Sequence, residues 1–290
     1  MVAINQDAVN RYGYCAIIGR PNVGKSTTFN ALLGHSISIV TRKAQTTQTE
    51  IMGVVTDLPY QYVMLDTPGV QCRLKRRTKL NRVAAKTVVE ADLAIFMVSG
   101  SQWTDDDTAA LNILKDFDGP VIGCVNKMDK LRQRPEQLEQ AIDRLRDAYS
   151  FHNIVTLSAR QSQHVDILHQ EICALLPTGE PGYPVETVTS HSDHFIIQEM
   201  VRAKVLELLH EEIPYEIAVT VDLTKEVEGK QHIYVTLWVR SSTQKGVVIG
   251  KGGQKLKQIG MQARAMIEQH FDAPVVLKTW VKVGVPDENY

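Results

Sequence analysis

An eight-residue segment, Gly19–Ser26 with the sequence GRPNVGKS, constrains the fold of this chain more than any other feature. It matches the pattern Gly-x4-Gly-Lys-Ser, in which glycines let backbone N–H groups surround an anion at the start of a helix. The apolar run Tyr14–Gly19 precedes the glycines and Lys25–Leu33 has helical spacing, so the segment joins a strand to a helix. That setting favours a phosphate-binding loop over a chance glycine turn that contains Lys-Ser.

Further short apolar runs predict an α/β domain with a parallel sheet. The runs are Tyr62–Leu65, Leu93–Val98, Val121–Val125 and Ile154–Leu157, and helical spacing is found in Leu138–Ala148 and Val165–Leu176. The segment Thr178–Pro184 holds two glycines and two prolines, a composition that favours a linker between two cores. We expect the first domain at 1–178, the linker at 179–194 and a second, α+β domain at 195–290.

The pattern after the linker predicts the element order αββααβ. Its expected elements include Phe195–His210, Ala218–Leu223, Ile233–Val239, Gln254–Gln269 and Val275–Val283.

Two motifs predict a phosphate and magnesium site. Lys25 would neutralise phosphate oxygens, and the Ser26 hydroxyl would bind Mg²⁺, which prefers oxygen ligands. Asp66-Thr67-Pro68-Gly69 follows a predicted strand, so its carboxylate could reach the same cation; alone, this tetrapeptide is more often a plain turn. The residues of these two segments that are predicted to bind the nucleotide are Gly19, Arg20, Pro21, Asn22, Val23, Gly24, Lys25, Ser26, Thr27, Asp66, Thr67, Pro68 and Gly69.

A third motif selects the base of the nucleotide. Asn126-Lys127-Met128-Asp129 follows the run Val121–Val125, at the carboxyl edge of the predicted sheet. The Asp129 carboxylate can accept hydrogen bonds from N1–H and the exocyclic amino group of guanine, which adenine lacks at those positions, so GTP and GDP are favoured. Ser158-Ala159 could complete the base pocket with a backbone N–H, although this dipeptide says little by itself.

A Gly-x-x-Gly sequence predicts an RNA site in the second domain. The residues Val248, Ile249, Gly250, Lys251, Gly252 and Gly253 precede the predicted helix at Gln254, which is the arrangement that a KH domain uses to clamp nucleotides. Lys245, Lys251, Lys255, Lys257 and Arg264 add positive charge with no acidic residue among them, which indicates phosphate contact. A flexible glycine turn beside a solvated basic face is the alternative.

These motifs, in this order, resemble those of the translation-factor-like GTPases, and Arg42-Lys43-Ala44-Gln45-Thr46-Thr47 narrows the resemblance to the Era family over almost the whole chain. In that family a threonine of this segment closes over the γ-phosphate and Mg²⁺; Thr46 and Thr47 are both candidates. The resemblance implies GTP hydrolysis with Lys25, Thr46, Thr47 and Gly69 as the catalytic candidates.

Val70 stands where many small GTPases carry a glutamine that orients the attacking water, so slow intrinsic hydrolysis is expected. The resemblance implies that backbone groups, a partner or a monovalent cation position this water instead. Asn22 matches the loop asparagine associated with K⁺ in related GTPases, with a simple turn residue as the alternative.

The resemblance also implies a type II KH domain that binds 16S ribosomal RNA near its 3′ end. The implied protein is a monomer of the cytoplasm that assists assembly of the small (30S) ribosomal subunit, with weak peripheral binding to the cell membrane as a further family trait. The rival interpretation is a constitutive RNA-binding adaptor whose nucleotide is structural. A second basic run could couple nucleotide state to RNA or could be a solvated helical face; it comprises Arg73, Lys75, Arg76, Arg77, Lys79, Arg82 and Lys86.

Composition excludes several other classes of protein. The net charge of −1 argues against binding nucleic acid through bulk charge, and the polar stretch Met1–Tyr14 does not read as a signal peptide. The apolar runs are too short to cross a bilayer. The four cysteines show no metal-ligand or disulfide spacing, and Cys15 and Cys124 lie in strand-like runs, where we expect buried thiols.

Overall fold

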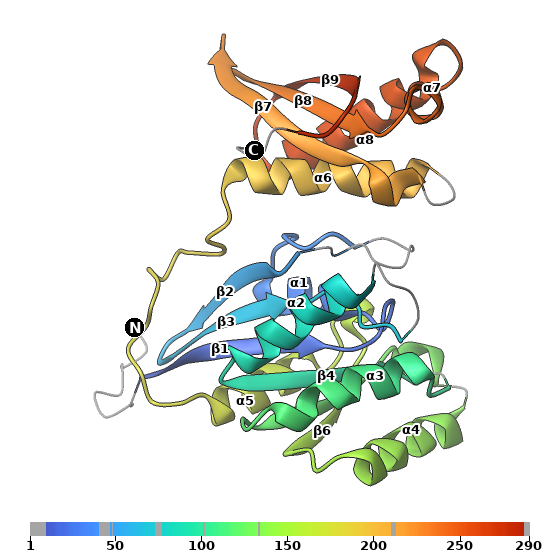
Figure 1. Ribbon diagram of the computed structural model, residues 1–290. Coiled ribbons are helices and arrows are strands. Elements are labelled where there is room, and N and C mark those ends of the chain that lie inside the picture. Colours follow the sequence, from blue (N-terminus) through green and yellow to red (C-terminus); the bar gives the residue numbers. More distant parts are fainter. Residues whose placement is uncertain are drawn as a thin grey trace. The chain divides into compact units, whose positions relative to one another are not determined.

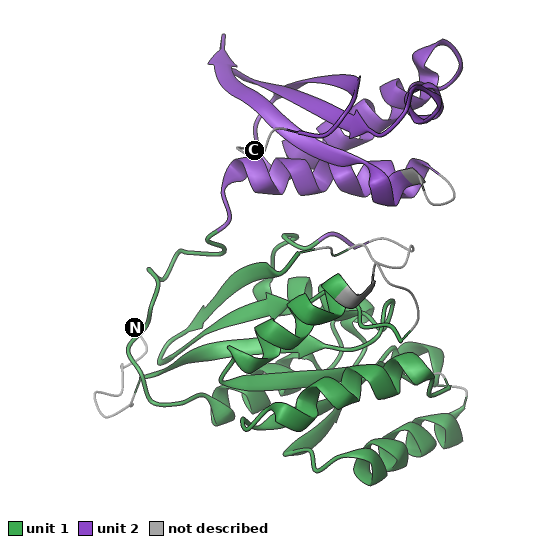
Figure 2. Ribbon diagram, in the orientation of Figure 1, with its two compact units in different colours: residues 1–38, 47–190 green, residues 39–46, 191–290 purple. Residues whose placement is uncertain are grey.

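The computed structural model describes residues 10–40, 47, 49–72, 77–100, 102–132, 134–209 and 213–286 (Figure 1). It divides the chain into two compact units, which we call unit 1, residues 1–38 and 47–190, and unit 2, residues 39–46 and 191–290 (Figure 2). The segment Arg42–Thr46, Gln48 and the basic residues Arg73, Lys75 and Arg76 lie outside the described residues.

Unit 1 is built on a six-stranded sheet with the order β2-β3-β1-β4-β5-β6. The strands are β1 (Arg11–Ile18), β2 (Ile51–Asp57), β3 (Tyr60–Asp66), β4 (Leu93–Ser99), β5 (Val121–Asn126) and β6 (Asn153–Thr156). All neighbours are parallel except β2 and β3, which form an antiparallel pair. The predicted parallel sheet is therefore confirmed, while β2 was missed because its sequence, IMGVVTD, breaks the apolar run with glycine and polar residues.

Helices cover both faces of this sheet (Figure 1). They are α1 (Lys25–Leu33), α2 (Arg77–Val89), α3 (Asp105–Ile113), α4 (Pro135–Ala148) and α5 (Val165–Leu175). Side chains of α2, α3 and α4 share one apolar cluster with Val63, Leu65 and Phe96. On the other face, Thr28 of α1 donates to the Met97 sulfur and Tyr62 is hydrogen-bonded to His169 of α5. Because side chains alternate between the two faces of a strand, the sheet packs against helices on both faces.

The segment 179–190 belongs to unit 1 and is hydrogen-bonded to its sheet, although its glycines and prolines predict a linker. Gln61, fully buried on β3, donates to the Tyr183 carbonyl at 2.8 Å and accepts from the Tyr183 N–H at 2.9 Å. On β2, the Val54 N–H donates to the Val188 carbonyl at 2.8 Å. A buried amide requires such partners, and the division between units falls between Ser190 and His191.

Unit 2 has the order αββααβ among its longer elements, as predicted. These are α6 (Asp193–Leu208), β7 (Ala218–Val227), β8 (Lys230–Val239), α7 (Ser242–Ile249), α8 (Gln254–Phe271) and β9 (Val275–Val283). In the sheet β7-β8-β9, β8 is antiparallel to β7 and parallel to β9. Alternate side chains of β8, such as Val235 and Leu237, are buried in a core shared with Ile259 and Ile267 of α8.

Two smaller expectations can be compared with the structure directly. Cys15 and Cys124 are completely buried, as predicted, whereas Cys72 is exposed. Within the described ranges, no helix is both long and apolar enough to cross a membrane.

Replacing Phe96 by alanine should destabilise unit 1 by ~3–5 kcal/mol, because this ring is fully buried and its removal leaves a cavity. The ring is stacked on Phe151, with centroids 5.8 Å apart, and lies 6.1 Å from Trp103. Urea unfolding followed by Trp103 fluorescence in a W238F/W280F background measures the effect. The control V89A alters an exposed side chain and should change the unfolding free energy by less than ~0.5 kcal/mol. Equal effects of the two variants would contradict this account of the core.

Candidate functional site

The Gly19–Ser26 loop connects β1 to α1 and is closed by its own lysine. Lys25 is buried, and its ammonium donates to the carbonyl oxygens of Gly19 and Arg20 at 3.0 Å each. Burial lowers the pKa of Lys25 to about 8, with Asp66 acting in the opposite direction. Gly24 has φ 109°, and a Cβ there would lie 2.1 Å from Asn126 Nδ2, so only glycine fits. The loop therefore confines the Lys25 ammonium and brings the backbone of Gly24 close to Asn126.

Asp66, at the end of β3, is the centre of a buried cluster of oxygen atoms. Its Oδ2 accepts from Ser26 Oγ at 2.6 Å and from Ser38 Oγ at 2.7 Å. Thr47 Oγ1 lies 3.2 Å from Ser26 Oγ and 3.5 Å from Asp66 Oδ2. Sequence reasoning missed Ser38, because no motif marks a serine in this loop. Thr46 lies outside the described residues, so only Thr47 of the two candidate threonines is placed.

The cluster fits a magnesium ion by the chemistry of its donors. Asp66 is completely buried, and its Oδ1 has no hydrogen-bond partner among the described residues. Burial raises the pKa of Asp66, while Lys25 and the three hydroxyl groups lower it. An unpartnered carboxylate oxygen beside hydroxyl groups is a set of ligands that a hard divalent cation prefers.

The rest of the Asp66–Gly69 motif approaches the loop closely. A Cβ on Gly69 would lie 2.7–2.8 Å from Pro21 atoms, so the glycine is required by close packing. Thr67 Oγ1 donates to the Ile17 carbonyl at 2.7 Å, and Pro68 is buried. The Val70 N–H donates to the Gly19 carbonyl at 3.2 Å, and its side chain is buried in the apolar core. Val70 therefore cannot orient water with its side chain.

Asn126, at the end of β5, ties three loops together. Its Nδ2 donates to the Val23 carbonyl at 2.9 Å, and its Oδ1 accepts from the backbone N–H of Lys127 at 2.7 Å and of Ala159 at 3.1 Å. Asp129 lies in the same loop, where its Oδ1 accepts from Ser158 Oγ at 2.6 Å. The three predicted motifs thus meet at one edge of the sheet.

The role of Ser158 and Ala159 in the base pocket stays a prediction, and both backbone N–H groups have other partners in this structure. We expected one of their backbone N–H groups to face the base, but Ser158 N–H donates to the Gln163 carbonyl and Ala159 N–H donates to Asn126. The Ser158 hydroxyl instead donates a hydrogen bond to the Asp129 carboxylate and holds it in position. In this conformation, a base oxygen would have to share the Ala159 N–H with Asn126.

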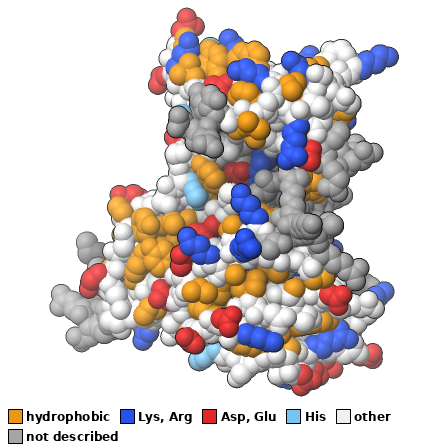
Figure 3. Space-filling model, viewed as in Figure 1, with side chains coloured by type: hydrophobic (Ala, Val, Ile, Leu, Met, Phe, Trp, Pro, Cys, Tyr) orange, Lys and Arg blue, Asp and Glu red, His pale blue; other side chains and the backbone are white. Residues whose placement is uncertain are grey.

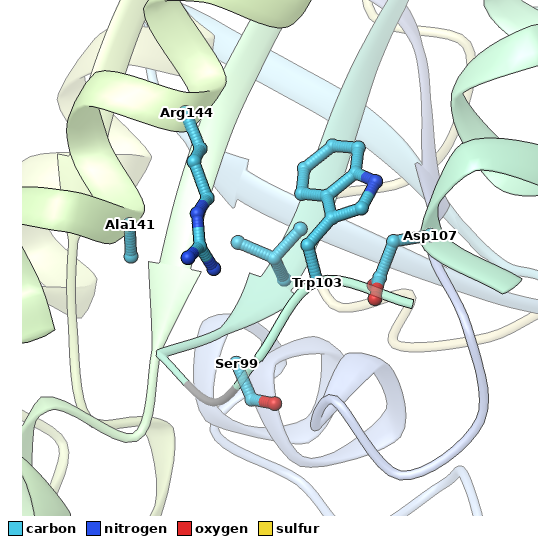
Figure 4. Close-up of a pocket in the computed structure, with 6 residues that line it drawn as sticks. Ser99, Trp103, Asp107, Ala141 and Arg144 are labelled. Carbon is cyan, nitrogen blue, oxygen red and sulfur yellow. The ribbon is translucent and has the colours of Figure 1, made fainter. Parts of the chain in front are cut away.

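The side chain of Arg20 is directed to α3, which leaves its backbone for the predicted contact with the nucleotide. Its Nε donates to Asp107 Oδ2 at 2.9 Å and a terminal nitrogen donates to Ser99 Oγ at 2.9 Å. Ser99 and Asp107 border the small pocket in Figure 4, whose volume of about 10 Å³ fits one water molecule at most. Arg20 therefore anchors the loop through its side chain and can offer a phosphate its backbone.

The remaining predicted residues line the loop or its neighbours. Asn22 is exposed with a left-handed backbone (φ 62°), and its carbonyl accepts from the Lys127 ammonium. Val23 is buried and Thr27 is half-buried in the first turn of α1. Met128 begins a one-turn helix, Met128–Lys130, that holds Asp129.

The glycine sequence of unit 2 forms a tight turn between α7 and α8. Gly250, Gly252 and Gly253 have φ values of 72°, 59° and 75°, which strain any other residue. Apart from each glycine and its chain neighbours, no atom of the described residues lies within 4 Å of a Cβ placed on Gly252 or Gly253, so this side of the turn is open. Val248 is fully buried and Ile249 packs against the same core, which anchors the turn.

The basic residues near this turn do not form one patch. Lys251 and Lys257 are exposed and Lys255 is half-buried, and positions two apart on α8 face different directions. Arg264 pairs with Glu268, with 3.5 Å between the charged atoms. Lys245 is half-buried on α7. Of the second basic run, Lys79, Arg82 and Lys86 are exposed on α2, as a solvated helical face would be.

Comparisons with known proteins agree with this geometry. A family model described as a 50S ribosome-binding GTPase matches residues 14–127, and a KH domain model matches residues 212–288. With the sheet and loops described above, these matches define a P-loop GTPase domain followed by a KH domain. GTPase Era from Vibrio vulnificus is 41% identical in a match of 276 residues that covers 93% of this chain and 86% of the relative. This chain belongs to the Era family of GTPases.

Other relatives extend the match to nearly the whole chain. GTPase Era from Actinobacillus pleuropneumoniae is 41% identical over 286 residues, or 98% of this chain and 94% of the relative. A crystal structure of an Aquifex aeolicus Era variant bound to GDP and AlF4⁻ has a TM-score of 0.88 and 35% identity, covering 96% of this chain and 95% of that one. Era in complex with MgGDPNP and nucleotides 1506–1542 of 16S ribosomal RNA gives the same values.

Replacing Asn126 by alanine should lower both nucleotide affinity and the stability of unit 1. The change leaves the Val23 carbonyl and two N–H groups without their buried partner, which costs ~1–3 kcal/mol per group. We expect GDP affinity to fall by about a hundredfold, measured with a fluorescent GDP analogue. The control N112A alters an exposed amide on α3 and should match the wild type. Wild-type affinity in N126A would show that these loops hold their positions without the amide.

Proposed function

We propose that this Era-family GTPase is a GTP-driven switch that binds 16S ribosomal RNA near its 3′ end and assists assembly of the 30S subunit. The proposal rests on the presence of two features in one chain: the buried Ser26–Asp66–Thr47 cluster of unit 1 and the open GKGG turn of unit 2. A relative with 35% identity binds MgGDPNP and this part of 16S RNA in one complex. We assign the G domain to 1–178 and the KH domain to 195–290.

The phosphates of GTP would lie against the Gly19–Thr27 segment. Lys25 is already confined beside the loop, and a phosphate oxygen would replace its contacts with the carbonyl groups of Gly19 and Arg20. Ser26, Thr47 and Asp66 would hold Mg²⁺, which neutralises charge on the phosphate oxygens when bound. The choice of Thr47 rests on its contacts with Ser26 and Asp66.

Hydrolysis would depend on groups other than a glutamine side chain. Gly69 would offer its backbone N–H to the γ-phosphate, and its close packing against Pro21 fixes the position of that group. Because Val70 is buried, we propose a slow intrinsic rate and water positioned by backbone groups, a partner or K⁺ at Asn22. Asn22 is exposed at the tip of the loop, where such a cation could reach it.

The KH domain would clamp a short stretch of single-stranded RNA at the GKGG turn. Val248 and Ile249 anchor the turn, and Lys251, Lys255, Lys257 and Arg264 would contact phosphates from different sides of α8. We place this activity in the cytoplasm, in a monomer. Peripheral association with the cell membrane is a separate proposal, supported only by the family resemblance.

Replacing Asp129 by asparagine should change the base preference from guanine to xanthine. The asparagine amide can donate to the 2-oxo group of xanthine, whereas it would oppose the 2-amino group of guanine. We expect GDP affinity to fall by about a hundredfold, since hydrogen bonds to charged groups are worth ~1.5–3 kcal/mol each, and XDP affinity to rise. The control D143N removes a carboxylate from the exposed face of α4. Unchanged preference in D129N would refute the assigned base site.

Binding to 3′-terminal 16S RNA should be tighter with a non-hydrolysable GTP analogue than with GDP. Fluorescence anisotropy with a labelled RNA fragment measures both affinities, and G252D serves as the variant that blocks the GKGG turn. Equal affinities in the two nucleotide states would favour a constitutive RNA adaptor with structural nucleotide. No binding in either state would refute the ribosomal role.

A further inference from the structure

In the part of unit 2 that the structure describes, the helices pack against one face of the sheet and leave the opposite face, which we call the outer face, uncovered. On β8, Ile233, Val235 and Leu237 are buried in the core with α6 and α8, so the alternate residues Tyr234, Thr236 and Trp238 point to the opposite side. The β9 residues paired with them in register are Lys278, Trp280 and Lys282. The GKGG turn lies on the helix side, so this outer face is a different surface.

Aromatic rings form the centre of this outer face. Trp280 is 44% exposed, an unusual degree for so large an apolar side chain. Its ring is parallel to that of Tyr234, with an angle of 7° and centroids 5.8 Å apart. Trp238 lies farther along β8 and is half-buried. The face thus presents several rings in a fixed arrangement.

Three lysines surround the rings. Lys278 and Lys225 place their ammonium groups 5.3 Å and 5.6 Å from the centre of the Tyr234 ring, and Lys282 lies 5.3 Å from that of Trp238. Figure 3 shows hydrophobic and basic side chains intermixed, with some acidic ones, over the part of unit 2 that holds this sheet. The combination of exposed rings and cations is complementary to bases and phosphates.

Hydrogen bonds hold the surface in place. Asp222, at the bulge of β7, accepts from Thr236 Oγ1 at 2.6 Å and from Thr220 Oγ1 at 2.9 Å. The Thr220 hydroxyl in turn accepts from Trp238 Nε1 at 3.0 Å. The threonine hydroxyls fix the position of this carboxylate without cancelling its charge, and the three lysines near the rings outnumber it.

We propose that this outer face is a second binding surface for single-stranded RNA, on which bases stack against Trp280 and Tyr234 while Lys225, Lys278 and Lys282 contact phosphates. It extends the RNA binding proposed for the GKGG turn and rests on that function for the identity of the RNA. Because β9 is an edge strand that α7 and α8 also contact, an RNA held at the turn could continue around β9 onto the outer face. A KH groove holds about four nucleotides, so only a longer strand would reach this second surface.

The first test uses the tryptophans as reporters. The chain contains three, Trp103, Trp238 and Trp280, so in a W103F variant both remaining indoles lie on the outer face. Adding the oligonucleotide U12 should quench their fluorescence, while U4 should leave it nearly unchanged. Equal quenching by U4 and U12, or none by U12 under conditions in which U12 binds, would overturn the proposal.

The second test measures affinity by anisotropy of labelled U12. W280A should weaken binding by about tenfold, the loss of one stacked base. K278A/K282A should lower the slope of log affinity against log salt by ~1.4, because each lost phosphate contact on a single strand contributes ~0.7. The matched control K115A/R146A removes two positive charges from exposed positions of unit 1 and should change neither quantity.

The outcomes separate this proposal from RNA binding at the GKGG turn. If G252D abolishes binding of U4 while W280A and K278A/K282A bind U12 as the wild type does, the outer face is no RNA surface and the turn remains one. If the outer-face variants weaken U12 alone and leave U4 binding and GTP hydrolysis intact, the second surface is established. If the wild-type protein binds the labelled 3′-terminal 16S fragment but neither U4 nor U12, the outer-face proposal is overturned and the RNA binding proposed for the GKGG turn stands.

Discussion

The buried carboxylate of Asp66 is the feature on which the nucleotide site depends. Charged groups lose solvation on burial, so a carboxylate this deep requires partners. Hydroxyl groups of Ser26, Ser38 and Thr47 supply them for one oxygen, and the other oxygen has none among the described residues. One acid at a strand end thus draws together α1 and the loops that precede β2. A bound cation would attract these same oxygen atoms, so ligand binding and the position of the loop can be coupled.

Asn126 performs the corresponding task for the base side of the site. Its single amide joins the phosphate loop, the loop after β5 and the loop after β6. The phosphate end and the base end of the site are consequently not independent, since Gly24 packs directly against this amide. A substitution in one motif should therefore alter the geometry of the other. Residues of these motifs also hold neighbouring loops in position, which is missed when each motif is given a single role.

Much of this arrangement could be predicted from the sequence, and the exceptions share a cause. Strand-terminal motifs such as Asp66–Gly69 and Asn126–Asp129 follow apolar runs, and parallel strands bring their carboxyl ends to one edge. The direction of the Arg20 side chain could not be predicted, because Asp107 and Ser99 are distant in sequence and belong to no motif. Ser38, the hydrogen bonds of Ala159 and the attachment of 179–190 to unit 1 likewise depend on tertiary neighbours rather than on local pattern.

Unit 2 shows the same limit in a different form. The GKGG turn could be recognised because three positive φ angles demand glycine and leave a signature in the sequence. The aromatic and basic outer face leaves none, since its residues alternate with core residues along β8 and β9 and are interrupted by α7 and α8. Only the register of the strands brings Tyr234 beside Lys278 and Thr236 beside Trp280. A surface assembled by strand pairing is therefore invisible to motif searches, even when its composition is that of a nucleic-acid platform.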